Sequence, residues 1–107
     1  MENKAVYYGD YLQLDKITDA QHPESFKDGN IAAHDEMLFI IIHQSYELWF
    51  KQLIHEFNAA SMSLQAGDTH RSLALLGRIR TILKVCVTQV DILETMTRSE
   101  EHTSELQ

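Results

Sequence analysis

The chain has 107 residues, of which 44% are hydrophobic and 23% are charged, with four glycines and one proline. This length allows one small domain, and this composition excludes a disordered, collagen-like or low-complexity chain. The formal net charge of −7 argues against nucleic acid or an anionic membrane surface as a partner.

The first predicted element is a short helix over residues 11–21. Gly9 offers a turn before it and Asp10 offers an N-cap, because an Asp carboxylate accepts hydrogen bonds from the first turn of a helix. The helix must end before Pro23, since the residue that precedes a proline is disfavoured in the α conformation. The polar residues 23–30 then predict a linker inside one domain.

The second predicted helix covers residues 32–65. Polar residues recur there at steps of three and four and predict one hydrated stripe, formed by Gln44, Glu47, Lys51, His55 and Asn58. A parallel stripe on another face consists of Phe39, His43, Tyr46, Phe50, Ile54 and Phe57. The hydrated stripe is missing from Met37 to His43, so we expect this segment to be buried on all sides. A chain this small can hardly bury it alone.

Gly67 and Asp68 predict the end of that helix and the N-cap of a third helix over residues 69–97. The core stripe predicted for the third helix contains Leu73, Leu76, Ile79, Leu83, Cys86, Val90 and Leu93. Two long helices joined by a short turn predict an antiparallel hairpin. No segment has the alternating pattern of a strand, so the predicted fold class is all-α, a helical bundle.

The sequence also predicts the cellular location of the protein. Its one cysteine, Cys86, cannot form an internal disulfide, and its longest apolar run, residues 37–42, is too short to span a bilayer. The first residues contain no apolar signal-peptide stretch. We therefore expect a soluble cytoplasmic protein with no membrane partner.

Six histidines raise the question of a metal site. No two of them have the i, i+3 or i, i+4 spacing of a helical zinc or di-iron site, so we expect no metal cage from this chain alone. His22, His55 and His70 are predicted to lie on the surface.

His43 is different, because it lies in an apolar turn four residues after Phe39. Composition alone favours a core histidine whose nitrogens are satisfied by a helix carbonyl or by water. The functional alternative is an acceptor for a ligand N–H in a dry pocket walled by Phe39. Near the N-terminus, Tyr8 and Tyr11 stand beside Leu12, where they can pack on this chain or clasp a neighbouring one.

Three longer motifs point to a family. They are YxxYLxLD from Tyr8, HDEMLFIIxHQ from His34 and ELWFKQ from Glu47. On these motifs the chain resembles the N-terminal part of the tryptophan 2,3-dioxygenases, from about Tyr7 to Thr97. The resemblance implies an all-helical homotetramer that holds haem b. With ferrous haem and O2 it would open the indole ring of L-tryptophan to give N-formyl-L-kynurenine.

The resemblance also assigns site residues. The distal pocket segment contains Phe39, Ile40, Ile41, Ile42 and His43. The residues that reach into a neighbouring subunit's active site are Tyr8, Tyr11 and Leu12. His43 matches the catalytic histidine that accepts a hydrogen bond from the indole N–H, and it need not act as a base, because iron and O2 carry the oxygen chemistry.

The C-terminal end departs from the family pattern. The arginine that holds the substrate carboxylate and the axial haem histidine have no match here, and we expect them beyond the end of the chain. We expect residues 1–97 to be a truncated N-terminal part of the family domain. Residues 98–107, RSEEHTSELQ, are expected to be a non-native tail translated in frame from a sequencing adapter.

A different class of function remains open from the residues alone. An acidic helical hairpin can also serve as an interaction module, whose apolar face binds another protein without catalysis. Periodicity predicts the same helices for both hypotheses, so it does not choose between them. The motif resemblance favours the enzyme.

Overall fold

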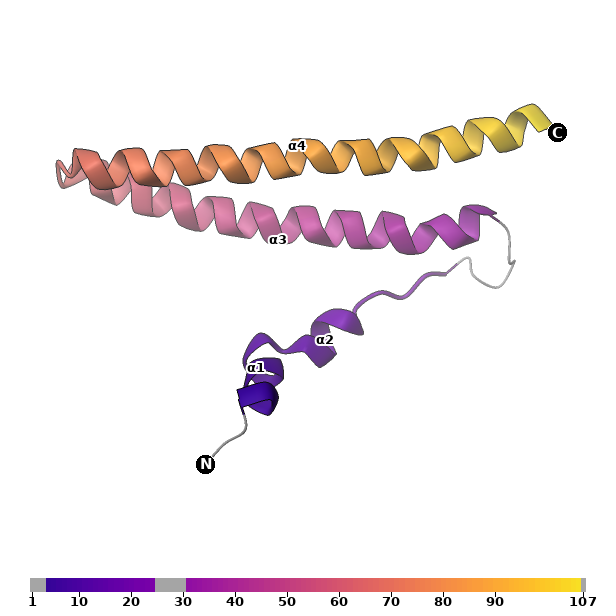
Figure 1. Ribbon diagram of the computed structural model, residues 1–107, viewed down its shortest axis with the longest axis horizontal. Helices are drawn as coiled ribbons and strands as arrows, with labels where there is room; N and C mark the ends of the chain where they lie inside the picture. Colours follow the sequence, from indigo (N-terminus) through magenta and orange to yellow (C-terminus); the bar gives the residue numbers. More distant parts are fainter. Residues whose placement is uncertain (1–3, 25–30, 107) are drawn as a thin grey trace. The chain divides into compact units, whose positions relative to one another are not determined.

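The computed structural model describes residues 4–24 and 31–106, and within them the side chains of residues 8–24 and 34–96. All elements in these ranges are helices: α1 (Lys4–Leu12), α2 (Leu14–Thr18), α3 (Ile31–Gln65) and α4 (Thr69–Leu106) (Figure 1). The all-α prediction is therefore confirmed. The chain divides into two compact units, residues 1–40 and 41–107.

The first unit contains α1 and α2 where one helix was predicted over residues 11–21, so that prediction is wrong. Gly9 and Asp10 lie inside α1, and the break comes at Gln13, whose φ of 55° is left-handed. The N–H of Gln13 donates to the carbonyl of Asp10 at 3.2 Å, and the N–H of Lys16 donates to the carbonyl of Gln13 at 3.0 Å. None of the residues of α2 is buried, so local backbone bonds rather than apolar packing set these helix ends.

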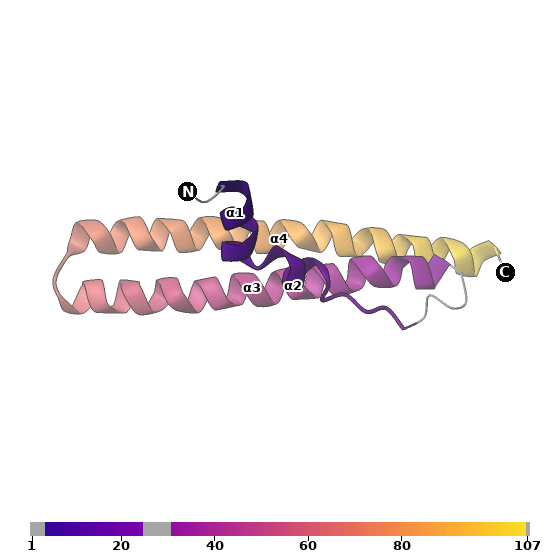
Figure 2. The same cartoon turned by 90° about the horizontal axis from the view of Figure 1, so that it is seen from below.

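The second unit is the antiparallel hairpin that periodicity predicted, made of α4 and the part of α3 from Ile41 onward (Figures 1 and 2). The predicted limits of α3 are confirmed to within one residue. The predicted end of α4 at Thr97 is wrong, because the helix continues to Leu106. Neither glycine nor proline occurs after Gly77, so the sequence contains no strong helix breaker there. None of the described helices has the length and apolar content that crossing a membrane requires.

The turn between α3 and α4 is built on Gly67 and Asp68, as predicted. Gly67 has a φ of +76°. The N–H of Asp68 donates to the carbonyl of Ser63 at 3.0 Å, and the N–H of Gly67 donates to that of Leu64 at 3.1 Å, which is the bond pair of a Schellman motif. A carboxylate oxygen of Asp68 then accepts from the N–H of Arg71 at 3.0 Å and caps α4.

Two glycine substitutions test this turn. We expect Gly67→Ala to lower the free energy of unfolding by about 1–2 kcal/mol, because a Cβ disfavours the left-handed conformation. Gly77→Ala, within α4, is expected to raise it by about 0.5–1 kcal/mol. An added Cβ meets no atom within 4 Å at either position, so the two substitutions differ in effect only through backbone conformation. Urea titrations followed by helical circular dichroism measure the free energy of unfolding of each variant. A change of the same sign in both variants would contradict this account of the turn.

The two helices pack along a seam with a seven-residue repeat. On α3 the seam consists of Ile42, Tyr46, Trp49, Leu53, Glu56, Ala60 and Ser63. On α4 it consists of Ser72, Leu75, Ile79, Ile82, Cys86, Gln89 and Leu93. All of these are buried or half-buried, and their alternating steps of three and four are typical of coiled-coil packing. Two hydrogen bonds between the helices fix which residues of α3 and α4 lie opposite each other. The Tyr46 hydroxyl donates to the carbonyl of Cys86 at 3.2 Å, and the Ser72 hydroxyl donates to the Ser63 hydroxyl at 2.9 Å.

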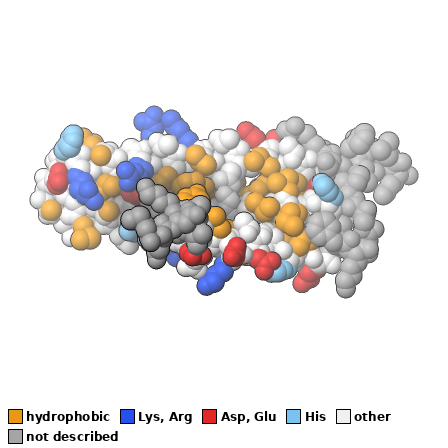
Figure 3. Space-filling view, turned by 60° about the horizontal axis from the view of Figure 1, so that its bottom comes forward, with side chains coloured by type: hydrophobic (Ala, Val, Ile, Leu, Met, Phe, Trp, Pro, Cys, Tyr) orange, Lys and Arg blue, Asp and Glu red, His pale blue; other side chains and the backbone are white. Residues whose placement is uncertain are grey.

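The core stripe predicted for α4 is therefore wrong in part. Ile79, Cys86 and Leu93 lie in the seam as predicted, but the exposed residues include Leu73, Leu76, Leu83 and Val90. The physical reason is that α4 carries apolar residues on more than one face, and the polar residues Ser72 and Gln89 take seam positions. Many other hydrophobic side chains reach the surface, as Figure 3 shows for one side of the molecule.

The hydrated stripe predicted for α3 is confirmed at the surface, where Glu47, Lys51, His55 and Asn58 are exposed and Gln44 is half-buried. The parallel stripe that begins at Phe39 is also largely exposed, and it contains the predicted site.

Candidate functional site

The predicted pocket residues lie on consecutive turns near the start of α3. Ile42 is buried in the seam and Ile40 is half-buried, whereas Phe39, Ile41 and His43 are exposed. Within the described residues this segment is only partly covered, as expected of a chain too small to bury it alone. The cause is that α4 packs against only one side of α3.

His43 stands at the end of a row of aromatic rings on α3. Its imidazole meets the ring of Tyr46 edge to face, with centroids 6.4 Å apart and planes at 87°. The ring of Tyr46 in turn stacks on that of Phe50, with centroids 6.0 Å apart and planes at 9°. Because the Tyr46 hydroxyl donates to the carbonyl of Cys86, α4 holds this row in place.

This arrangement suits a flat, apolar molecule that carries one N–H donor. Helical spacing puts Phe39 one turn before His43 on the same face, and Tyr46 follows one turn later. A neutral imidazole offers one nitrogen acceptor, and the flanking rings offer apolar contact. His43 is exposed in this chain, so the described residues do not bury it as a core histidine.

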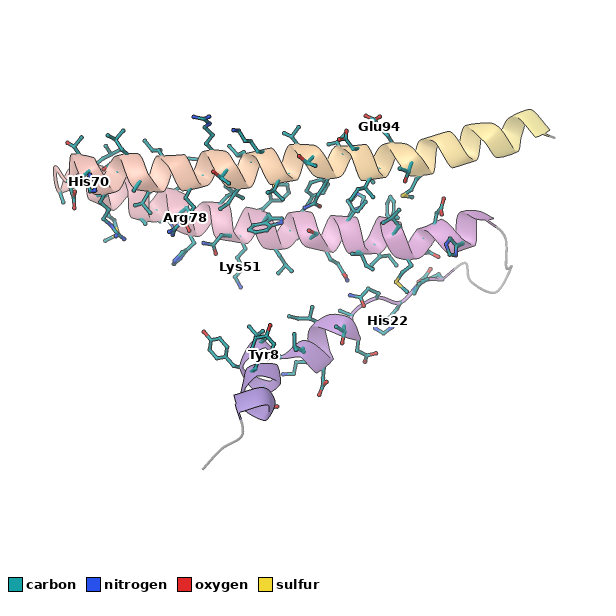
Figure 4. The ribbon with its side chains drawn as sticks, viewed as in Figure 1. Tyr8, His22, Lys51, His70, Arg78 and Glu94 are labelled. Atoms are coloured by element: carbon teal, nitrogen blue, oxygen red, sulfur yellow. The ribbon has the colours of Figure 1, made fainter. Side chains whose placement is uncertain are left out.

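The other predicted site residues lie on α1. Tyr8 and Tyr11 are 60% and 71% exposed, and Leu12 is half-buried. Spacings of three and four residues place both Tyr11 and Leu12 on the face of Tyr8. Figure 4 shows the Tyr8 side chain projecting outward from its helix. Both tyrosine rings are therefore accessible to a neighbouring chain.

The histidines whose side chains the structure describes do not gather with other metal-binding residues. Within residues 8–24 and 34–96, no group of three or more His, Cys, Asp or Glu side chains is placed to hold a metal ion. His22, His55 and His70 are exposed, as predicted. Figure 4 shows His22 and His70.

Sequence reasoning missed a buried carboxylate in the seam. Glu56 is 3% exposed, accepts a hydrogen bond from the amide of Gln52, and lies 3.5 Å from the guanidinium of Arg78. The Arg78 side chain is largely exposed, so this ion pair contributes roughly 1 kcal/mol at most. The signal was present in the sequence, because Glu56 follows Leu53 and precedes Ala60 at the steps of the seam.

The sequence of the chain is also similar to that of a known protein family. A family model described as "Tryptophan 2,3-dioxygenase" matches residues 1–102. Curated proteins of that name are similar to the chain. The one from Anaeromyxobacter sp. (strain K) is 50% identical over 93 residues, which cover 87% of this chain and 33% of the relative. The one from Dictyostelium discoideum is 52% identical over 99 residues, which cover 88% of this chain and 24% of the relative. The chain thus spans a quarter to a third of the length of these relatives.

Proposed function

The chain belongs to the tryptophan 2,3-dioxygenase family, and we propose on this basis that it forms the part of a haem dioxygenase that receives the indole ring of L-tryptophan. The enzyme would use O2 to open that ring and release N-formyl-L-kynurenine. The observation that carries the proposal is the exposed imidazole of His43, aligned with aromatic rings inside the matched segment.

In this proposal His43 orients the substrate. One imidazole nitrogen accepts the indole N–H, and the proton stays on the indole nitrogen. The ring of Phe39 lies against the apolar face of the indole and excludes water from it. A hydrogen bond to a buried N–H contributes most when its loss leaves that donor unsatisfied, which costs roughly 1–3 kcal/mol.

Haem fits these residues as a neighbour. Phe39 provides exposed apolar surface on the face of His43, and a porphyrin, like an indole, is a flat group with apolar faces. When bound, haem iron supplies the activation of O2. We assign no axial ligand to the described residues of this chain, whose proposed task is to hold and orient the indole.

We propose further that the working enzyme is a cytoplasmic homotetramer. Tyr8, Tyr11 and Leu12 would complete the active site of a neighbouring subunit, and the exposure of both tyrosine rings supports this role. The cytoplasmic location is supported by the single cysteine, Cys86, which allows no internal disulfide.

A graft tests the proposed reaction. Residues 1–97 of this chain replace the matched region of the Anaeromyxobacter relative, without residues 98–107, which we propose to be a non-native tail. With haem, reductant and O2, the graft is expected to form N-formylkynurenine from L-tryptophan well above a free-haem control. A graft that folds and binds haem like the relative but shows no turnover would contradict the proposal.

A further inference from the structure

Exposed apolar side chains follow the seam residues on both helices of the hairpin. On α3 they come directly after Trp49, Leu53 and Glu56, and on α4 directly after Leu75, Ile82 and Cys86. Each is between 42% and 69% exposed. We call this set the docking face, and it consists of Phe50, Ile54, Phe57, Leu76, Leu83 and Val87.

Both rows of the docking face lie on the same side of the hairpin. One residue along an α-helix corresponds to a rotation of about 100°, so each row is turned by that angle from the seam. Because α3 and α4 run antiparallel, the same rotation along each chain brings both rows to one side. The alignment of Tyr46 with Cys86 and of Ser63 with Ser72 places Phe50 level with Leu83.

The α4 half of this face forms an open groove with basic residues beside it. Its lining includes Leu76, Leu83 and Val87 together with the side chains of Arg80 and Lys84. A groove of this kind fits an amphipathic helix whose apolar stripe lies in it and whose flank is acidic. A second copy of this chain is a poorer match, because each copy carries a net charge of −7.

The length of the relatives indicates where such a helix comes from. The matched 93 residues are 33% of the Anaeromyxobacter protein, so about two thirds of that protein lies outside the match. Soluble monomers rarely leave a contiguous apolar patch larger than a few hundred Å² exposed. The rest of the family fold is therefore the best source of cover for the docking face.

We propose that the docking face binds an amphipathic helix from the part of the family fold outside the matched residues, with acidic side chains meeting Arg80 and Lys84. This inference rests on exposure, charge and length, and not on the reaction proposed above. His43 follows the seam residue Ile42 in the same way that Phe50 follows Trp49. The side of the hairpin that the helix covers is therefore also the side of His43.

Cysteine labelling tests the proposal without an activity assay. Leu83→Cys probes the docking face, and Met62→Cys is the matched control, because Met62 is 70% exposed and precedes the seam residue Ser63 instead of following it. Each variant is alkylated with N-ethylmaleimide in the graft and in the chain alone, the latter diluted until it sediments as a monomer. Mass spectrometry separates the new site from Cys86. We expect Leu83→Cys to react at least about 100-fold more slowly in the graft, and Met62→Cys to react equally in both.

Three results would overturn the proposal. The first is equal reactivity of Leu83→Cys in the chain and in a folded graft. The second is protection in the graft that is lost when the graft is diluted to a monomer, which would assign the face to a second copy. The third is unchanged labelling after Arg80→Glu and Lys84→Glu in the graft, since an acidic partner helix predicts faster labelling. If the graft does not fold, the same labelling is performed on the chain coexpressed with the remainder of the relative, and absence of protection there counts against the proposal.

Discussion

In the graft, His43→Ala is expected to lower kcat/KM for L-tryptophan by roughly tenfold to a hundredfold, which corresponds to an unsatisfied N–H in a closed pocket. A substrate methylated on the indole nitrogen has no donor for His43, so the same substitution should change its kcat/KM far less. The ratio of the two losses, measured by N-formylkynurenine formation or its methylated counterpart, isolates the hydrogen bond from general damage to the pocket.

His55→Ala is the matched control, because His55 is also an exposed histidine of α3 and lies on the hydrated stripe. It should leave both substrates unaffected. Equal losses for the two substrates in His43→Ala would assign His43 a structural role and contradict the proposed acceptor.

The chain by itself is expected to form no N-formylkynurenine above a free-haem control and to self-associate. Phe39 and Ile41 are 49% and 46% exposed, so the segment around His43 cannot exclude water without further protein. The docking face adds an apolar surface that soluble monomers rarely tolerate. Sedimentation velocity measures the association, and near-ultraviolet dichroism of Trp49, which packs against the core, reports how well the seam is ordered.

A compact monomer with a sharp Trp49 signal would show that the hairpin needs no cover, and turnover above the control would show that the site is complete. The first result would contradict the expected self-association, and the second would contradict the expected lack of activity.

The long helices and their turn were predictable because local signals specify them. Gly67 and Asp68 determine the turn through backbone conformation and capping, and both act within a few residues of chain. The burial of α4 was not predictable in the same way. Leu76 and Leu83 are as apolar as Leu75 and Ile82, so only the alignment with α3 decides which row becomes the seam.

For the site, the motifs identified Phe39 and His43, but sequence patterns did not show how much of these side chains this chain itself covers. An apolar segment predicts that a surface is covered and does not say which chain covers it. The burial of Glu56 was overlooked because a polar side chain is expected to be exposed. A carboxylate between exposed neighbours is expected to be hydrated, and its burial depends on Gln52 and on Arg78 from the other helix.

The seven-residue repeat of the seam has a consequence for natural changes in chain length. If one residue were lost from α4 between the turn and Leu75, every later residue would move into the position before it. Leu76, Leu83 and Val87 would then occupy the seam, and their apolar side chains would still pack against α3. Arg80 would move into the buried position of Ile79, so the deletion would destabilise the hairpin as well as bury the surface that the partner helix needs. We therefore expect the length of α4 to constrain both folding and assembly, and a deletion of seven residues from α4, which preserves the phase of the repeat, to disturb the packing less than a deletion of one.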